Sequence, residues 1–189
     1  MKALIVCASR YGSTEEIGKW IAERLGYDGI SADVVRTPGS GSVADFDLVV
    51  MGSGIYSHGV LPELKEFVEA NRGELQGKPV ALFGVAMKKE TVLHKGKPYG
   101  GVHYLHPLAE MLDGSVLHAG MLLGEMVPQK LTDSEREGLM RFYRQVEMDE
   151  AEIKRRMSPR TLMSKSECWE FAEAVLRKLS RREAPHGNG

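Results

Sequence analysis

Short apolar runs that recur between amphipathic helical patterns restrict the fold of this chain more than any other feature. Four of these runs are apolar almost throughout: ALIVC (3–7), DLVVMG (47–52), PVALFGV (79–85) and SVLHAGML (115–122). Runs without polar alternation are typical of parallel strands that are covered on both faces. Residues 30–35 alternate weakly between apolar and polar, which predicts a further strand at the edge of the sheet.

Helical patterns separate these strands, with apolar residues at three- and four-residue spacing. They cover residues 15–25, a segment that begins near Pro62, and residues 164–179, where Ser164 and Glu167 form a capping-box sequence. Because strands and helices alternate throughout, we expect an α/β fold. Its form is a doubly wound parallel sheet with right-handed crossovers and helices on both faces.

The length of 189 residues favours one domain with a sizeable core. We expect that domain to span residues 1–182, with insertions at about 86–107 and 122–163 and a frayed tail at 183–189. Such long excursions from a compact domain are usually functional or disordered.

The charge balance argues against one broad class of partner. Lysine and arginine together number 25 and aspartate and glutamate 26, so the formal net charge is −1. This balance speaks against an extended nucleic-acid footprint. Cys7 and Cys168 form neither a CxxC pair nor a metal-like cluster, so we expect both thiols to pack in the core and the chain to bind no metal. With no leader-like start and no apolar stretch long enough to span a bilayer, the sequence predicts a cytoplasmic protein.

The loop after the first strand is rich in small and hydroxyl-bearing residues and reads CASRYGSTEE over residues 7–16. Gly12 lets the backbone approach a ligand, and the following helix offers unpaired N–H groups and the positive end of its dipole. The loop lacks the Gly-Lys-Ser/Thr ending of a Walker A motif and the GxGxxG of dinucleotide sites, so it favours a single terminal phosphate. A simpler alternative is that Ser13 and Glu16 only form a capping box.

A second glycine-rich loop, GSGIYSHG at residues 52–59, follows the next buried strand and carries one aromatic residue, Tyr56. In open doubly wound sheets, ligands bind beyond the carboxyl ends of neighbouring strands where the strand order reverses. The strands that end at Cys7 and Gly52 would be these neighbours. The alternative is that glycine and serine only make a strand-to-helix turn.

With these two loops the chain resembles the flavodoxin family. Ser9 to Thr14 matches the family's phosphate loop, Thr/Ser-x-Thr-Gly-x-Thr, with Tyr11 in place of the middle threonine. DLVVMGSGIYSHG is similar to the family's strand and flavin-flanking loop, and the resemblance runs to about Val127 and resumes in the last helix. Within the family the chain looks most like the flavodoxin-fold, quinone-dependent protoporphyrinogen oxidases, which carry a long insertion before the last strand and an Ala-Gly pair like Ala119-Gly120. The resemblance implies the flavodoxin-like strand order 2-1-3-4-5.

The resemblance also implies FMN as a noncovalent cofactor, and it assigns no catalytic acid, base or nucleophile. Phosphate contacts would come from the first loop, and the ring would be flanked by the second loop and by the end of the third buried strand. The residues in these three groups are Ser9, Arg10, Tyr11, Gly12, Ser13 and Thr14; Ser53, Gly54, Ile55 and Tyr56; and Val85, Ala86 and Met87. Tyr56 could stack on the flavin ring. His58 could bond a flavin carbonyl or relay a proton, with a solvent-facing histidine as the alternative.

Both insertions carry charged residues whose role has two interpretations. In the first insertion, four lysines lie among tyrosines and histidines. These side chains could hold a carboxylate-bearing substrate such as a porphyrin. The alternative is that the lysines belong to a solvated loop. The lysines are Lys88, Lys89, Lys95 and Lys97. In the second, Thr132 and Glu135 match a capping box. The arginines of residues 136–160 fit either a membrane-surface or partner-binding helix or a solvated charged helix.

The resemblance, together with the long insertions, implies an FMN-dependent oxidoreductase that oxidises protoporphyrinogen with a quinone or another acceptor. The alternatives are a flavodoxin-type electron carrier between protein partners, an NAD(P)H-dependent quinone reductase, and an interaction module that keeps the fold without the cofactor. A carrier usually has a strongly acidic docking surface, and the net charge of −1 speaks against that alternative. We expect the partners to be a redox donor and acceptor (small molecule, quinone or protein), with peripheral membrane contact as an additional alternative.

Overall fold

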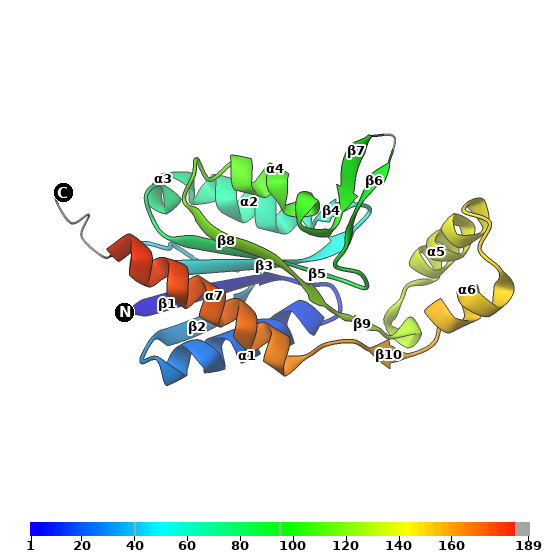
Figure 1. Cartoon of the computed structure of the whole chain (residues 1–189), viewed down its shortest axis with the longest axis horizontal. Coiled ribbons are helices and arrows are strands. Elements are labelled where there is room, and N and C mark those ends of the chain that lie inside the picture. The colour runs from blue at the N-terminus through cyan, green and yellow to red at the C-terminus, as the bar shows by residue number, and fades with distance from the viewer. Residues whose placement is uncertain (40, 95, 184–189) are drawn as a thin grey trace.

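The computed structural model describes residues 1–39, 41–94 and 96–183. Its centre is a mainly parallel sheet (Figure 1). The five parallel strands are β1 (Lys2–Ala8), β2 (Ser31–Arg36), β3 (Leu48–Tyr56), β5 (Val80–Ala86) and β8 (Val116–Leu123). They lie in the order β2-β1-β3-β5-β8, with the short β4 (Gly59–Val60) added antiparallel to β3. Counted along the chain, the parallel strands follow the order 2-1-3-4-5, which confirms the predicted doubly wound sheet.

Helices cover both faces of the sheet, as predicted (Figure 1). The helices of one face are α1 (Ser13–Tyr27) and α7 (Lys165–Glu183), and those of the other are α2 (Pro62–Ala70), α3 (Arg72–Leu75) and α4 (His106–Glu110). Alternate residues of β1 show why the apolar runs are continuous, since Ile5 belongs to the core beneath α1 and α7, whereas Leu4 belongs to the core beneath α2. Each central strand therefore needs apolar side chains on both of its faces.

Two glycines allow close packing between the sheet and α7. Phe83 pairs with Gly52 across β3 and β5, and a Cβ added to Gly52 would lie 1.9 Å from the Phe83 Cζ atom. Gly120 leaves room for the ring of Phe171, whose Cδ2 lies 3.1 Å from the position of a Cβ. The rings of Phe83 and Phe171 meet edge to face with their centroids 5.8 Å apart. Both rings belong to the core on this side of the sheet.

Both predicted insertions fold into regular structure and project from the end of the sheet where the parallel strands finish (Figure 1). In the first, β6 (Thr91–His94) and β7 (Lys97–Gly100) form a hairpin that is followed by the 3-10 helix η1 (Gly101–Leu105). The elements of the second are β9 (Glu125–Met126), the 3-10 helix η2 (Pro128–Lys130), α5 (Asp133–Gln145), α6 (Glu150–Arg156) and β10 (Arg160–Thr161). β9 and β10 pair antiparallel and close the base of this second insertion, which we call the α5–α6 arm (residues 124–163).

The helix starts confirm one predicted cap and correct another. α5 begins with the predicted capping box: the Thr132 hydroxyl accepts from the Glu135 amide at 3.2 Å, and the Glu135 carboxylate accepts from the Thr132 amide at 2.9 Å. The alternative of a Ser13–Glu16 capping box is wrong, because α1 has Gly12 at its N-cap and no side-chain cap among the described residues. The Ser13 hydroxyl is directed to a different partner, in the α5–α6 arm.

Both cysteines are buried, and burial raises the pKa of each thiol to about 12, which suits packing better than reactivity. Among the described residues, no group of three histidine, cysteine, aspartate or glutamate side chains is arranged to hold a metal ion. None of the described helices combines the length and the apolar content needed to cross a bilayer. Of the tail predicted to fray, residues 184–189 lie outside the described residues.

Candidate functional site

The carboxyl ends of β1, β3 and β5 bring the predicted site residues to one edge of the sheet. In the parallel register, Ala8 pairs with Ser53 and Gly54 pairs with Val85. The three predicted loops therefore start side by side, at the edge from which the β6–β7 hairpin and the α5–α6 arm also project (Figure 1). This is the position at which open α/β sheets bind ligands.

The loop between β1 and α1 leaves the start of a long helix available to a ligand. Gly12 occupies the N-cap position with a φ of 101°, a left-handed conformation that favours glycine. The first helical hydrogen bond runs from the Glu16 amide to the Gly12 carbonyl at 3.0 Å, so the amides of the first turn have no acceptor within the helix. Because α1 has 15 residues, its dipole adds partial positive charge here. The residues present fit an anionic group such as a terminal phosphate.

Two side chains hold the loop of residues 9–14 in shape, and we call it the phosphate loop after its predicted role. The Ser9 hydroxyl accepts a hydrogen bond from the Gly12 amide at 3.0 Å. Arg36, the last residue of β2, donates through Nη2 to the Ser9 carbonyl and, at 3.3 Å, to the Arg10 carbonyl. Sequence reasoning missed Arg36. Its role depends on the pairing of β2 with β1, which sets Arg36 beside Cys7 at the end of the strand.

Glu135 of the α5–α6 arm docks onto the phosphate loop. Its Oε1 accepts from Arg10 Nη1 at 2.7 Å, and its Oε2 accepts a short hydrogen bond from the Tyr11 hydroxyl. The hydrogen bond from Tyr11 is the main reason why the pKa of Glu135 falls to about 2. Glu135 is therefore ionised at neutral pH and joins the arm to the loop by two charge-assisted contacts. Sequence reasoning identified Glu135 only as a capping residue, because it is 124 positions away from Tyr11.

A second ion pair of the arm lies beside the start of α1. Lys130 Nζ donates to the Tyr11 carbonyl at 3.2 Å and to Glu125 Oε1 at 3.3 Å. The Ser13 hydroxyl donates to the same Glu125 oxygen at 3.2 Å. Lys130 thus balances the carboxylate that contacts the first residue of α1. The paired ammonium and carboxylate groups both lie next to the uncapped helix start.

Tyr56, the residue predicted to stack on the ring, lies half-buried at the end of β3. Its ring folds back over Gly54, where an added Cβ would lie 2.6 Å from Tyr56 Cε2. The Arg10 guanidinium lies 4.6 Å from the Tyr56 ring centroid, and the Tyr11 ring approaches edge-on with its centroid at 6.2 Å. Burial raises the pKa of Tyr56 to about 12, so the phenol is neutral at neutral pH. The two predicted loops therefore meet through Arg10, Tyr11 and Tyr56.

Ser53 differs from the other predicted contacts because it has no exposed surface. Its hydroxyl donates to the Gly54 carbonyl at 2.7 Å and accepts from the Leu61 amide at 2.9 Å, which ties β3 to the start of α2. The position of Ser53 gives no support to a direct contact with a cofactor. Ile55 is partly buried and packs with its Cδ1 3.4 Å from the Cβ position of Gly84, so it links β3 to β5.

The turn that follows Tyr56 is strained. Ser57 and His58 have φ values of 46° and 67°, in the left-handed region that favours glycine, and they join the paired residues Tyr56 and Gly59. Left-handed non-glycine residues cost about 1–3 kcal/mol each and cluster at binding and active sites. The surroundings hold this turn, since His58 Nδ1 lies 3.3 Å from the Tyr104 hydroxyl.

His58 is the centre of a group of aromatic side chains from four segments. Its ring centroid lies 5.1 Å from that of Tyr99 in β7, 6.1 Å from that of Tyr104 in η1 and 6.5 Å from that of Phe142 in α5. Tyr99 and Phe142 are 39% and 44% exposed. We call these four residues the aromatic cluster. Sequence reasoning noted His58 and the tyrosines of the first insertion but did not bring them together, because their meeting with Phe142 depends on how both insertions fold beside the β3–β4 turn.

The end of β5 borders the same edge. Val85 is buried, whereas Ala86 and Met87 are partly exposed. The Ala86 carbonyl accepts from the Gly124 amide at 2.9 Å, at the point where the α5–α6 arm begins. The three residues that were predicted to line the ring from this side thus lie between the β3–β4 turn and the arm.

The structure describes the side chains of two of the four lysines in the first insertion. Lys89 Nζ pairs with Glu167 Oε1 at 2.8 Å and so ties the insertion to α7. Lys88 is exposed. Lys95 and the side chain of Lys97 lie outside what the structure describes. A common carboxylate-binding role for the four lysines therefore stays a prediction.

The fold and the paired loops define a mononucleotide-binding α/β domain of the flavodoxin type. A family model described as "Flavodoxin domain" matches residues 4–152, and the chain belongs to that family. FMN is the cofactor of the family and therefore of this domain. An uncapped α1 start beside a half-buried tyrosine fits the phosphate and the ring of that mononucleotide.

Solved structures agree on the fold. The two-electron reduced flavodoxin of Megasphaera elsdenii is 17% identical with a TM-score of 0.57, over 93% of this chain and 98% of that one. Oxidised Flavodoxin 1 of Bacillus cereus is 17% identical with a TM-score of 0.56, over 94% and 98%. The rubredoxin oxygen:oxidoreductase of Desulfovibrio gigas is 19% identical with a TM-score of 0.52, over 95% of this chain but 37% of that one. At these identities the likeness concerns the fold, and it gives no support to the finer resemblance to protoporphyrinogen oxidases.

Proposed function

We propose that this chain is an FMN-dependent oxidoreductase that takes electrons from an organic donor at the aromatic cluster and passes them to a separate acceptor. As a member of the flavodoxin family it is an FMN-binding redox protein. The observation that supports an organic donor is the aromatic cluster. In it, rings from both insertions lie close to His58 of the β3–β4 turn. Partly exposed rings in this place offer a ring-containing donor a surface for stacking.

In this proposal each loop has a defined task. The amides of the first turn of α1 would hold the FMN phosphate, with Lys130 beside them. Gly54 and Tyr56 would lie against the ring, and Met87 would border it from the end of β5. FMN supplies the capacity to accept and return electrons. His58, held 3.3 Å from the Tyr104 hydroxyl, would take up or release the proton that accompanies them.

Protoporphyrinogen is the specific donor that the sequence resemblance suggests, with a quinone or another molecule as acceptor. Such a donor carries both rings and carboxylates. The aromatic cluster suits the rings, and the exposed Lys88 at the base of the hairpin offers a charge for a carboxylate. A cytoplasmic location belongs to this proposal.

The test is to mix the FMN-loaded protein with protoporphyrinogen under anaerobic conditions and to follow the flavin absorbance. We expect the donor to bleach the oxidised flavin and an added quinone to restore it. Because one aromatic contact contributes about 0.5–1.5 kcal/mol, Tyr99→Ala should slow bleaching about threefold to tenfold without changing FMN affinity. Tyr27→Ala, at a tyrosine that is 68% exposed on α1, is the matched control.

The outcomes separate the parts of the proposal. Protein that binds FMN but is not bleached by protoporphyrinogen would rule out this donor. Equal rates in the Tyr99→Ala and Tyr27→Ala variants would contradict the role of the aromatic cluster.

An electron carrier between protein partners is the second candidate. One observation favours it: arginines on α5 have no acidic partner among the side chains that the structure describes. Reduction that requires a protein donor would favour the carrier. Rapid bleaching of bound flavin by NADPH alone would instead indicate an NAD(P)H-dependent quinone reductase.

A further inference from the structure

We propose that the outer face of α5 is a docking surface for an acidic redox protein that accepts electrons from the bound flavin. This inference rests on the proposed function, because the cofactor must supply those electrons. The face is an open hollow between the side chains of one helix. Its lining residues, which we call the arginine face, are Arg136, Glu137, Met140, Arg141, Arg144 and Gln145.

The arginines of this face are available to a partner. Within the described part of the chain, no carboxylate side chain lies at ion-pairing distance from Arg141 or Arg144, and both are exposed. Arg136 donates through Nη2 to the Pro128 carbonyl at 2.9 Å and keeps its charge. Glu137 is the acid among the lining residues, so the face carries a net positive charge.

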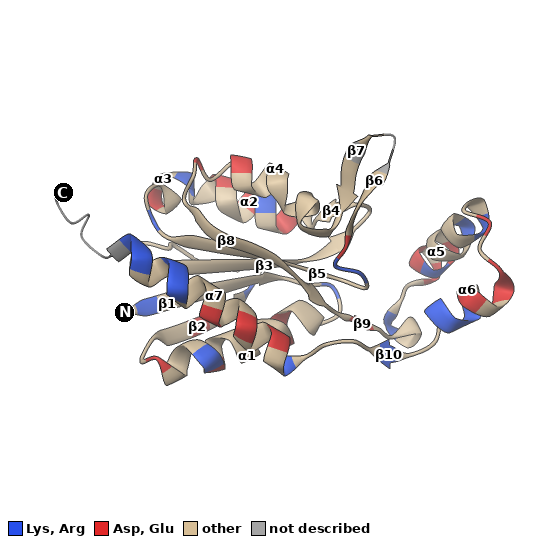
Figure 2. Ribbon diagram, in the orientation of Figure 1, with Lys and Arg blue, Asp and Glu red and all other residues tan. Residues whose placement is uncertain are grey.

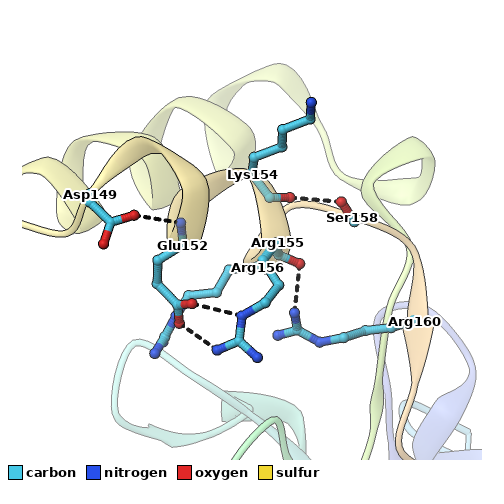
Figure 3. Close-up of polar contacts among 7 residues, drawn as sticks. All are labelled: Asp149, Glu152, Lys154, Arg155, Arg156, Ser158 and Arg160. Carbon is cyan, nitrogen blue, oxygen red and sulfur yellow. Dashed lines mark hydrogen bonds and ion pairs between the residues drawn. The ribbon is translucent and has the colours of Figure 1, made fainter.

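The other basic run of the arm, residues 154–160, is occupied in holding α6 together (Figure 3). Glu152 accepts from Arg155 Nε at 2.7 Å and Nη2 at 2.8 Å, and from Arg156 Nε at 2.6 Å. Arg160 donates to the Arg155 carbonyl at 2.7 Å. Acidic and basic residues are interleaved along the arm (Figure 2). Arg155 and Arg156 of α6 share the carboxylate of Glu152, whereas the described part of the chain offers Arg141 and Arg144 of α5 no such acidic partner.

α5 lies across the cofactor site. Glu135 at its start bonds to the phosphate loop, and Phe142, seven residues later, meets His58 at the ring-side turn. Seven helical residues span about 10 Å, and a helix with its side chains is about 10–12 Å across. A partner on the arginine face would therefore be separated from the cofactor site by the width of one helix.

The shape and polarity of the face favour a protein over a small ligand or a bilayer. One helix alone lines the hollow, whereas small-molecule sites enclose most of their ligand. A membrane-surface helix flanks exposed apolar residues with basic ones. On α5 the apolar Leu139, Phe142 and Tyr143 project by helical spacing from the opposite side, where Phe142 contacts His58 and Tyr143 contacts Arg156. Met140 is the apolar residue among the lining residues, and the rest of the arginine face is charged or polar with a net positive charge, which suits an acidic protein surface.

The experiment uses the full chain loaded with FMN and chemically reduced, with two electron-accepting probes of opposite charge. Rubredoxin is the acidic probe and cytochrome c the basic one. We expect electron transfer to rubredoxin to slow as salt rises, and to fall about tenfold at low salt in Arg141→Glu and in Arg144→Glu. Lys154→Glu is the matched control, because it makes the same charge change on α6, where the ammonium group points away from the ion pairs (Figure 3). Its rate should stay within about twofold of the unmodified protein.

Several outcomes would overturn the proposal. Equal effects of all three charge reversals, or a rubredoxin rate that does not depend on salt, would show that the arginine face is not the docking surface. Transfer to cytochrome c that falls in parallel would indicate a general loss of activity. Sedimentation with anionic lipid vesicles that only the α5 variants lose, with unchanged rubredoxin rates, would assign the face to a membrane.

The same samples distinguish this proposal from the proposed function. A variant or parent protein that fails to bind FMN fails at the cofactor site, before docking is tested. Protein that binds FMN but is not reduced by protoporphyrinogen contradicts the proposed donor. Because the flavin is reduced chemically in the docking experiment, the arginine face is tested in either case.

Discussion

At the scale of single residues, Glu135 joins the α5–α6 arm to the phosphate loop through Arg10 and Tyr11. Hydrogen bonds to a charged group contribute about 1.5–3 kcal/mol each. We therefore expect Glu135→Gln to raise amide hydrogen exchange across residues 124–163 by about tenfold or more, while exchange in β1 and β3 stays unchanged. Asp133→Asn, in the same helical turn, is the matched control. Equal exchange in the two variants would contradict this role for Glu135.

The pKa of Glu135 makes the docking of the arm depend on pH. Since the folded state lowers this pKa to about 2, the ionised form favours docking. The contribution should be complete above the ordinary carboxyl pKa of about 4.3 and should be lost as the pH falls from there towards 2. Backbone NMR signals of α5 should report a transition in this window in the unmodified protein. The same transition in Glu135→Gln would assign it to another group.

The β3–β4 turn offers a test of stored strain. Ser57 has a φ of 46°, which glycine adopts without the steric cost of a Cβ. Allowing for the greater entropy of glycine in the unfolded chain, Ser57→Gly should raise the free energy of unfolding by about 1 kcal/mol. Ser57→Ala should give no such gain. Urea denaturation measures both, and a destabilised glycine variant would contradict the strain.

At the scale of elements, the strands could be predicted from the sequence because each central strand is buried on both faces. The continuous apolar runs are a direct consequence of that burial, as Leu4 and Ile5 of β1 show. The order of the strands required the resemblance to a known family. The capping box of α5 was predictable because Thr132 and Glu135 are only three positions apart in the sequence.

The remaining parts of the site depend on contacts between distant segments, which sequence patterns do not record. Ser13 matches a cap by its spacing to Glu16, yet its hydroxyl bonds to Glu125 of the arm. Arg36 and Lys130 act on backbone carbonyls of the phosphate loop, and a carbonyl leaves no signal in the sequence. Their roles follow only once β2 and the arm are in place.

Packing between the elements gives a further prediction. Because a Cβ on Gly52 would lie 1.9 Å from the Phe83 ring, Gly52→Ala should lower the free energy of unfolding by about 1–3 kcal/mol. Phe83→Leu removes the atoms that clash, so the double variant should be more stable than the sum of the two single changes predicts. Denaturant unfolding of the four proteins measures this coupling. Strict additivity would show that the clash is relieved elsewhere.

At the scale of the whole molecule, two insertions project from the end of a flavodoxin-type sheet where its parallel strands finish (Figure 1), and each contributes an aromatic ring beside His58. The near-neutral net charge of −1 hides an uneven distribution, since the arginine face of α5 is lined by three arginines and one glutamate. The candidate site is therefore assembled from two sources, the sheet and the insertions. The phosphate loop and the β3–β4 turn with His58 come from the sheet, and the insertions add the other three rings of the aromatic cluster and the arginine face.

The most direct measurement of the central claim compares FMN with riboflavin, which lacks the phosphate. Titration of the cofactor-free protein with each, followed by flavin fluorescence, gives the two dissociation constants. If the uncapped start of α1 holds the phosphate, FMN should bind about 100-fold more tightly or better, equivalent to about 2.7 kcal/mol. Equal affinities for FMN and riboflavin would contradict the assignment of residues 9–14 as the phosphate loop.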